Sequence, residues 1–429
     1  MRTTRWIAGL VTLTLVASAC ADDTRGGEAA AGEVVELRSE VAREDPGTLD
    51  ATAAVEGDTA FALALYRELV ADDPDANLFF SPYSISIALA MTLAGARGQT
   101  WEEMAGVLGA TEGEGWHRAR NALDRHLDRE RPAVDELQPL ELEITNSLWG
   151  QDGYPFRQDV LDQLARHYGA GLRTVDFATA WEEARATINE WVEERTDQRV
   201  VELIPEGAID QFTRLVLVNA IFFNANWVNQ FDPALTTEGA FRAPDGEVTV
   251  PMMRQEVRTG YGEGDGWQAI RLPYAGQASM LVVAPEYGRF DEIAGSLDAS
   301  RLDDIQGSLR DSLVDLTMPR FEFRSELSLP DVLTRLGMEQ AFVEPLGDSG
   351  ADFTGMVDVR ELFVSDVVHQ AFVSVDEEGT EATAATAVII SVDSMPMPAT
   401  ITLDRPFVFV IVDDMTGSIL FVGQLTDPS

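Results

Sequence analysis

One segment near the C-terminal end of this 429-residue chain constrains the fold more than any other. It runs from Val373 to Ala387 and reads V-S-V-D-E-E-G-T-E-A-T-A-A-T-A. Val373 and Val375 alternate with polar residues as in a strand, and the residues after Gly379 are nearly all small. The segment is too polar for a core strand, and it lacks the bulky apolar stripe of an amphipathic helix.

The residues after Gly379 have one face that suits the interior of a sheet. Side chains alternate between the two faces along a strand. The even-numbered positions from Thr380 to Ile390 are all small or apolar, and the charged Glu381 falls on the odd face. The pattern predicts a segment that can enter a sheet as an additional strand, with its even face inward.

A secretory signal occupies the N-terminal end. An apolar run from Trp6 to Ala19 follows Arg2 and Arg5, and it is shorter than the roughly 20 residues that span a bilayer. It ends in small residues before Cys20, the only cysteine of the chain. Two interpretations stay open: ordinary cleavage near this point, or cleavage before Cys20 with lipidation of its thiol. We favour lipidation because the single cysteine stands at that position.

We expect three parts of the chain. Residues 1–19 form the signal peptide, residues 20–57 form a lipidated cysteine and a disordered acidic tether, and residues 58–429 form one folded domain. The tether is rich in Ala, Glu, Asp, Gly and Thr and has no hydrophobic period. The protein is expected to be exported, as a cell-envelope lipoprotein or an extracellular protein that meets the membrane only through a lipid anchor. An exported domain without a disulfide fits a bacterial origin better than an animal one.

The chain is strongly acidic. It has 73 acidic residues against 31 basic ones, all of them arginine, and a net charge of −42. This charge argues against nucleic acid as a partner, because phosphates would be repelled. Two explanations of the acidity stay open, a proteome-wide compositional bias and life in a saline medium that screens the self-repulsion.

Hydrophobic periodicity predicts helices in the first half of the chain and mainly strands in the second. Asp58 is expected to cap a helix that carries Phe61, Leu65 and Leu69, and further helices are expected at 84–96, 101–108, 116–127 and 181–196. Strands are expected at 142–150, 215–223, 267–272, 280–283 and 314–319, and a final hairpin at 407–412 and 419–423. This order of elements indicates an α+β fold.

The chain has no recognisable catalytic motif. It contains no H-E-x-x-H, no C-x-x-C pair and no G-x-S-x-G. The alternating glycines at 262, 264 and 266 are explained better by a turn than by a phosphate-binding loop. His369 lies in the apolar run V-V-H-Q-A-F-V and fits a hydrogen-bonded core residue. We therefore predict that the protein is not an enzyme and that it uses no cofactor and no metal.

The segment E-E-G-T-E-A-T-A-A-T resembles the hinge of the reactive loop of the serpins, which carry it at a similar distance from the C-terminus. Further motifs resemble that family in the same order over residues 61–428. They are N-L-F-F-S-P-Y-S-I (77–85), T-I-N-E-W-V (187–192) with Thr196, L-V-N-A-I-F-F-N-A-N-W (217–227), L-P-Y (272–274), M-P-R-F (318–321), L-G-M (336–338), A-D-F-T-G-M (351–356), V-V-H-Q-A-F-V (367–373), D-R-P-F-V-F-V-I (404–411) and G-S-I-L-F-V-G (417–423).

The resemblance implies the serpin fold, with three β-sheets, about eight to nine helices and an exposed reactive-centre loop. It implies a polar cluster under the centre of the main sheet and a tryptophan at the top of the opening, where the hinge first enters. The cluster residues are Ser81, Ser84, Asn219 and His369, and the tryptophan is Trp227. The implied hinge residues are Glu378, Gly379, Thr380, Glu381, Ala382, Thr383, Ala384, Ala385 and Thr386.

The resemblance also implies inhibition of a serine protease, or a cysteine protease, as a suicide substrate. The protease attacks the loop and forms a covalent acyl-enzyme, and the cleaved loop then inserts into the main sheet before water can release the enzyme. A non-inhibitory serpin, with a carrier, chaperone or storage role, is the alternative. No charge or proline obstructs the inward positions of the hinge, which favours inhibition. The protein is expected to be a monomer apart from its covalent complex with the target.

The reactive bond follows from two counts that disagree. With Gly379 fifteenth before the bond, as serpins usually have it, cleavage falls between Asp393 and Ser394. Counting back from the motif at 405–407 places it at Met395, before a proline. We favour the first count because the sheet sets the inserted length and because proline after the bond makes a poor substrate. Val392 is the rival cleavage residue, since its apolar neighbours suit elastase-like or subtilisin-like enzymes.

Overall fold

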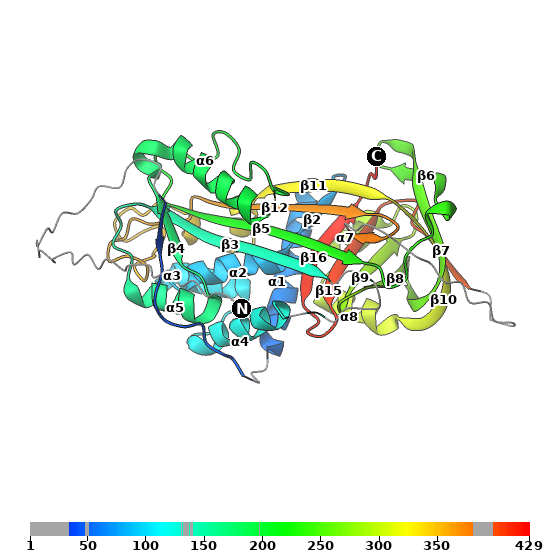
Figure 1. The fold of residues 1–429 in the computed structure, drawn as a ribbon, viewed down its shortest axis with the longest axis horizontal. Coiled ribbons are helices and arrows are strands. Elements are labelled where there is room, and N and C mark those ends of the chain that lie inside the picture. The colour runs from blue at the N-terminus through cyan, green and yellow to red at the C-terminus, as the bar shows by residue number, and fades with distance from the viewer. Residues whose placement is uncertain are drawn as a thin grey trace, which may run out of the picture.

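Figure 1 shows the chain in a computed structural model, which describes residues 34–47, 51–129, 131, 137, 140–196, 198–380 and 398–429. A seven-stranded main sheet crosses the front of the molecule. In spatial order its strands are β1 (Val35–Leu37), β4 (Leu172–Val175), β3 (Glu141–Gln151), β5 (Leu215–Asn226), β13 (Gly379–Thr380), β12 (Asp366–Val375) and β11 (Phe321–Ser328).

A second hydrogen-bonded sheet fills the other part of the molecule. Its strands follow the order β14 (Ala399–Thr402), β10 (Arg310–Pro319), β7 (Gly246–Gly264), β8 (Trp267–Tyr274), β9 (Ala278–Pro285), β15 (Phe407–Asp413), β16 (Ile419–Leu425) and β2 (Leu78–Phe80), with β6 (Thr237–Ala243) also paired to β7. The long β7 pairs first with β6, then with β10 and finally with β8. The described strands therefore form two hydrogen-bonded sheets where three were expected, because β7 links β6 and β10 to β8 in one network.

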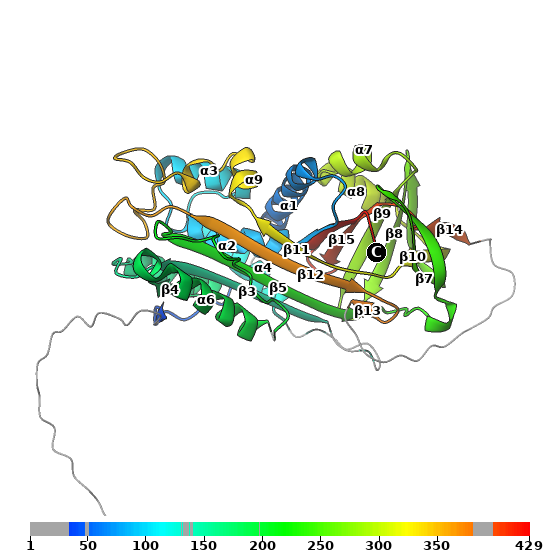
Figure 2. The same cartoon turned by 90° about the horizontal axis from the view of Figure 1, so that it is seen from above.

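Helices cover both faces of the main sheet. Figure 2 shows α6 (Phe177–Arg195) on one side, and α1 (Thr52–Asp72), α2 (Pro82–Leu93) and α4 (Glu114–Leu127) on the other. The remaining helices are α3 (Gly98–Leu108), α5 (Gln158–Tyr168), α7 (Phe290–Gly295), α8 (Ala299–Ser308) and α9 (Pro330–Arg335), with short 3-10 turns at Pro233–Leu235 and Gln340–Phe342. Within the described part of the chain, no helix has both the length and the apolar character needed to cross a bilayer.

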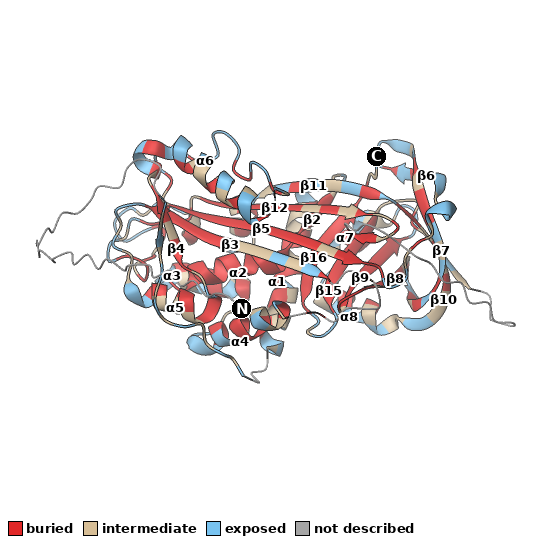
Figure 3. Cartoon of the chain, in the orientation of Figure 1, coloured by how far each residue is buried: buried red, intermediate tan, exposed pale blue. Residues whose placement is uncertain are grey.

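The main sheet is buried on both faces, as its central strand β5 shows (Figure 3). Leu217 and Ile221 of β5 belong to the larger core, which includes residues of α2. Val216 and Val218 face the other way and pack with residues of α6. A strand covered on both faces is apolar at nearly every position, which explains the apolar sequence L-V-L-V-N-A-I-F-F at residues 215–223. Asn219 is the one polar residue in that run.

The start of α2 lies directly beneath the main sheet. The hydroxyl of Ser81 accepts a hydrogen bond from the backbone N–H of Ser84, which makes Ser81 the N-terminal cap. Pro82 follows at the first helical position, where its missing N–H costs nothing. The cap places Ser81 and Ser84 under the middle strands, so a local helix signal also positions two residues of the polar cluster.

The structure corrects the expected N-terminal boundary of the domain. β1 is an antiparallel neighbour of β4, with Val35 opposite Thr174 and Leu37 opposite Leu172. The Arg43 side chain also donates a hydrogen bond to Asn121 of α4 at 2.9 Å. The prediction of a disordered tether is therefore wrong for residues 34–47 and for residues 52–57, which form the start of α1, whereas residues 20–33 and 48–50 lie outside the described residues. The triplet V-E-L is too short for strand alternation to be visible in the sequence.

The prediction that Asp58 caps a helix is also wrong. α1 begins at Thr52, so Asp58 lies inside the helix, where only 3% of its surface is exposed. It forms an ion pair with Arg120 of α4 at 2.8 Å. Burial raises the pKa of Asp58, and the nearby Arg120 opposes that rise. Asp58 thus ties α1 to α4 in the helical layer.

Candidate functional site

The candidate site is the boundary between β5 and β12, which we call the seam. Along one part of the seam the two strands are directly paired in parallel, from Asp366 opposite Val216 to Ala371 opposite Ile221. We call this the closed part. Beyond it the strands no longer pair with each other, and β13 lies between them, bonded to β5 on one side and β12 on the other. We call this the open part of the seam.

A tight turn at residues 376–379 leads from β12 back into the open part. The backbone N–H of Asp376 donates to the carbonyl of Gly379 at 3.0 Å. The Asp376 carboxylate accepts the backbone N–H groups of Glu378 at 2.8 Å and of Gly379 at 3.1 Å. An aspartate that bonds the backbone two and three residues ahead stabilises such a turn. We call residues 376–379 the hinge turn.

The segment that follows β5 holds the carbonyl groups of the hinge turn. The backbone N–H of Trp227 donates to the carbonyl of Glu378 at 2.9 Å, and that of Phe231 donates to the carbonyl of Glu377 at 2.8 Å. The indole N–H of Trp227 donates to the carbonyl of Asp376 at 3.0 Å. The turn is therefore fixed to β5 mainly by backbone contacts, which depend little on the side chains of the turn.

An aromatic pair supports the first inserted residue. The rings of Trp227 and Tyr274 stack with centroids 4.2 Å apart. The Tyr274 hydroxyl and the Thr380 hydroxyl share a hydrogen bond of 2.9 Å, and Thr380 is only 1% exposed. Thr380 therefore faces inward, the orientation that alternation predicts for even-numbered positions of this segment.

An ion pair between the buried Glu377 and the half-exposed Arg320 anchors the hinge turn to the other side of the seam. The Glu377 residue is 3% exposed, and its carboxylate accepts a hydrogen bond from Nε of Arg320 at 2.7 Å and another from the hydroxyl of Thr236. Burial by itself would raise the pKa of Glu377, but these hydrogen bonds outweigh it and hold the pKa below its usual value. Arg320 lies between β10 and β11, so this contact connects the turn to both sheets.

Gly379 is required by the close approach of two backbones. A Cβ atom at this position would lie 2.1 Å from the carbonyl oxygen of Ala225. No side chain fits at that distance, so the glycine lets the chain enter between β5 and β12.

The polar cluster lies under the closed part of the seam. His369 of β12 is fully buried, and its Nε2 accepts the backbone N–H of Ser81 at 3.1 Å. Its Nδ1 therefore carries the proton and donates to Oδ1 of Asn219. Burial lowers the pKa of His369 to about 3, so the ring is neutral at physiological pH.

Asn219 connects three strands and α2. Its Nδ2 donates to the Ser84 hydroxyl at 2.6 Å and to Oδ1 of Asn146. The Ser84 hydroxyl in turn donates to Oδ1 of Asn146 at 2.9 Å. Asn146 on β3 and His369 on β12 are both direct neighbours of Asn219 across the sheet. Each of these polar groups has a partner, so the network is stable when closed, and strand separation must break it.

The structure brings the described candidate residues together in two groups. Glu378, Gly379, Thr380 and Trp227 meet in the open part, and Ser81, Ser84, Asn219 and His369 meet in the closed part. The other hinge residues, Glu381, Ala382, Thr383, Ala384, Ala385 and Thr386, lie outside the described residues, as do Val392, Asp393, Ser394 and Cys20.

Sequence reasoning missed four residues of the site. Asn146, Tyr274, Glu377 and Arg320 were assigned no role. Asn146 could have been found from strand register, since it is a polar residue opposite Asn219. Arg320 and Glu377 are far apart in sequence, and no pattern pairs them. Across the described ranges, no group of His, Cys, Asp and Glu residues is arranged to hold a metal ion.

Comparison with known proteins identifies the family. The model of the family Serpin (serine protease inhibitor) matches residues 56–428. An uncharacterized serpin-like protein of Thermococcus kodakarensis is 39% identical over 376 residues, which are 86% of this chain and 84% of the relative. The leukocyte elastase inhibitor of Homo sapiens is 35% identical over 382 residues, which are 86% of this chain and 98% of the relative.

Solved structures agree with this assignment. The thermophilic serpin tengpin in its native state superposes with a TM-score of 0.81 at 26% identity, over 92% of this chain and 100% of tengpin. Thyroxine-binding globulin in complex with thyroxine superposes with a TM-score of 0.76 at 29% identity, over 87% of this chain and 99% of the globulin. The chain therefore belongs to the serpin family.

Proposed function

We propose that this serpin inhibits serine-type endopeptidases as a suicide substrate, by inserting its cleaved loop into the seam. The observation that carries the proposal is β13, which already lies between β5 and β12. Thr380 is seated inward there, and Gly379 permits the close approach. A strand that has begun to form at one end of the seam can be extended along it.

The proposed chemistry uses the nucleophile of the target enzyme. Its hydroxyl attacks a loop carbonyl, the peptide bond breaks, and the new amine leaves with the C-terminal segment. The loop residues before the bond stay esterified to the protease. Extending β13 then requires the six direct residue pairs of the closed part to separate and the polar cluster to rearrange. About 14 residues at about 3.4 Å each carry the ester on the order of 45–50 Å.

The relatives support this function and also define its alternative. Leukocyte elastase inhibitor is named as an inhibitor, and it is similar to this chain over nearly its whole length. Thyroxine-binding globulin shares the fold in a complex with thyroxine, so a non-inhibitory binding role is the alternative. The small, uncharged side chains at the even positions 380–386 favour inhibition, because each would become buried on insertion.

The reactive bond is proposed between Asp393 and Ser394, with Val392 as the rival cleavage residue. Mass spectrometry of the C-terminal peptide released by the protease distinguishes the two. A peptide that starts at Ser394 supports the first, and one that starts at Asp393 supports Val392. A start upstream of Ser391 would contradict the count from the hinge.

Export with lipidation at Cys20 is proposed for localisation. Cys20→Ala should release the protein from membranes or block its processing. Mass spectrometry that finds a mature N-terminus downstream of Cys20 and no lipid would contradict the anchor.

The function is tested by incubation with serine proteases of the chymotrypsin and subtilisin types, followed by denaturing gel electrophoresis. We expect a covalent complex with at least one of them. Thr380→Arg should be cleaved without forming the complex, because it places a charge at a buried inward position. Thr400→Arg, an exposed threonine on β14, is the matched control and should still form the complex. Cleavage of the wild type by every enzyme without any complex supports the non-inhibitory alternative.

A further inference from the structure

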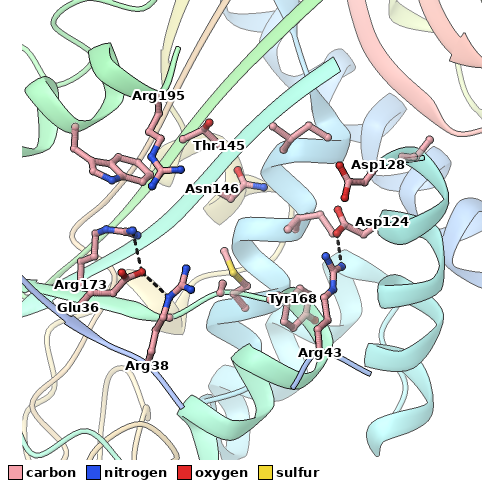
Figure 4. A pocket seen from close by; sticks show the side chains of 18 of the residues that line it. Glu36, Arg38, Arg43, Asp124, Asp128, Thr145, Asn146, Tyr168, Arg173 and Arg195 are labelled. Atoms are coloured by element: carbon pink, nitrogen blue, oxygen red, sulfur yellow. Dashed lines mark hydrogen bonds and ion pairs between the residues drawn. The ribbon is translucent and has the colours of Figure 1, made fainter. Parts of the chain in front are cut away.

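A cavity of about 290 Å³ lies at the β1 side of the main sheet (Figure 4). Its walls come from β1, β3 and β4 of the sheet, from α2 and α4 beneath it, and from α6 above it. Its volume suits a small molecule and is too small for a protein segment. None of the roles proposed above uses this cavity.

The charges around the cavity are unusual for so acidic a chain. Four of the 31 arginines line it, although acidic residues outnumber basic ones 73 to 31 in the whole chain. Arg43 is paired with Asp124. At the other end, Arg38 and Arg173 both donate to the same carboxylate oxygen of Glu36, each at 2.9 Å (Figure 4).

Arg195 of α6 adds a third cation at this end of the cavity. No described residue gives it a carboxylate partner within ion-pair distance. At this end of the cavity the single carboxylate of Glu36, paired with Arg38 and Arg173, faces three guanidinium groups, which leaves a local surplus of positive charge. Burial lowers the pKa of Arg173; Glu36 opposes this, and the charges of Arg195 and Arg38 lower it further. Arg38 and Arg195 are thus each close enough to repel Arg173.

Trp191 holds two of these cations in place. The guanidinium of Arg173 lies 4.4 Å from the centroid of the Trp191 ring, and that of Arg195 lies 5.7 Å from it. Such cation–π contacts fix the position of a guanidinium group without neutralising it. Guanidinium groups held in place in this way match the planar or tetrahedral oxygens of carboxylates and phosphates.

We propose that this cavity binds a small molecule that carries an oxyanion, a carboxylate or a phosphate, against Arg38, Arg173 and Arg195. The apolar side chains of Leu142 and Ile144 line the same cavity and can accommodate a short apolar body. The surplus of positive charge, the two guanidinium groups stacked on Trp191 and the cavity volume together carry this assignment.

The cavity is also connected to the polar cluster. Asn146 lines the cavity and accepts hydrogen bonds from Asn219 and Ser84. A ligand that bridges the sheet and α6 favours the conformation in which their spacing is preserved. The bound anion should therefore hold the closed part of the seam. The coupling between the cavity and the seam can be measured without a protease. Its biological role, control of loop insertion, rests on the proposed function.

Binding is tested by calorimetric titration of the full chain with inorganic phosphate and with hexanoate, at constant ionic strength set with sodium chloride. Arg195→Gln should weaken binding about tenfold, because it removes one charge-assisted hydrogen bond. Glu36→Gln should strengthen it by a similar factor, because it removes the carboxylate that competes for the arginines. General destabilisation of the fold would weaken binding in both variants, so it cannot explain opposite changes in affinity.

Arg125→Gln is the matched control, since Arg125 is an exposed arginine of α4 outside the cavity. It should bind both probes as the wild type does. The assignment is overturned if neither probe binds at about 10 mM, or if Arg125→Gln loses as much affinity as Arg195→Gln, which would indicate screening of the net charge.

The coupling is tested by hydrogen exchange of residues 216–221, the β5 side of the closed part. Saturating probe should slow their exchange in the wild type and leave it unchanged in Arg195→Gln. Unchanged exchange in the wild type would overturn the coupling. Neither measurement uses a protease, so a failure of inhibition and a failure of this site are seen separately.

Discussion

The two parts of the seam are held together by different chemistry. In the closed part, β5 and β12 pair directly, and a fully bonded polar cluster lies beneath them. In the open part, β13 and the hinge turn separate the strands. They are held by contacts to backbone carbonyls, one aromatic pair and the ion pair of the half-exposed Arg320 with Glu377. In the proposed mechanism, the open part guides the hinge, whereas the closed part sets the resistance to insertion.

The difference follows from what each part must do in the proposed mechanism. Contacts to backbone carbonyls tolerate whatever side chains the loop presents, so they suit an entry point. A buried network of hydrogen bonds is stable only when every partner is in place, so it favours an all-or-none opening. Apolar contacts have no required direction, so an apolar interface of the same size could open gradually.

The largest effect is expected from Asn219→Ala in the closed part. The change leaves His369, Ser84 and Asn146 without their shared partner in a buried site, and it should lower the free energy of unfolding by about 3–5 kcal/mol. Urea unfolding measures it. Asn224→Ala, on the same strand but half-buried, is the control and should cost about 1 kcal/mol or less. Equal losses in the two variants would show that the polar cluster has no special role.

Acid should weaken the closed part next. The pKa of His369 is about 3 in the folded protein and about 6.5 in the unfolded chain, so the unfolded state binds the proton first. Stability from this group is complete above pH 6.5 and is lost as the pH falls toward 3, by about 1.4 kcal/mol per unit. His117, with a pKa also lowered to about 3 by burial, adds a similar dependence elsewhere. His369→Gln should therefore show a shallower decline, and an unchanged slope would argue against a neutral buried His369.

Arg320→Ala should act on the open part with a smaller global effect. It leaves the buried Glu377 carboxylate with Thr236 as its remaining side-chain partner, at a cost of about 2–3 kcal/mol. Hydrogen exchange of Gly379 and Thr380 should accelerate more than that of residues 216–221. Arg324→Ala, an exposed arginine on β11, is the control. Equal acceleration along the whole seam would contradict the division into two parts.

The smallest effect is expected from Tyr274→Phe. The ring stack with Trp227 is retained and only the hydrogen bond to Thr380 is lost, so the cost is about 1 kcal/mol. Limited proteolysis should become slightly faster at the hinge. Tyr287→Phe, a largely exposed tyrosine, serves as the control and should change nothing.

Much of the seam could be predicted from sequence because its motifs are local and ordered. The small even-numbered positions, Gly379 and the run that contains Asn219 each carry a pattern that a strand or a turn requires. The structure brings the described members of both groups together along the seam, and their role in insertion stays a prediction.

The features that sequence reasoning missed depend on contacts between segments that are distant in the chain. Glu377 and Arg320 are separated by 57 residues, and the chain has so many acids that no particular pair stands out. Asp58 has the residue type of a helix cap, yet its partner Arg120 places it in the interior. β1 has only three residues, and its pairing with β4 is decided by tertiary packing.

Thermal unfolding of the loop-cleaved protein tests the central claim most directly. The loop is cut within residues 381–397 by limited proteolysis, and intact and cleaved samples are heated under the same conditions. Insertion into the seam adds a strand bonded on both edges, so the cleaved wild type should unfold about 10 °C or more above the intact protein. Cleaved Thr380→Arg should show no such rise. A cleaved wild type that unfolds at or below the temperature of the intact protein would contradict insertion at the seam.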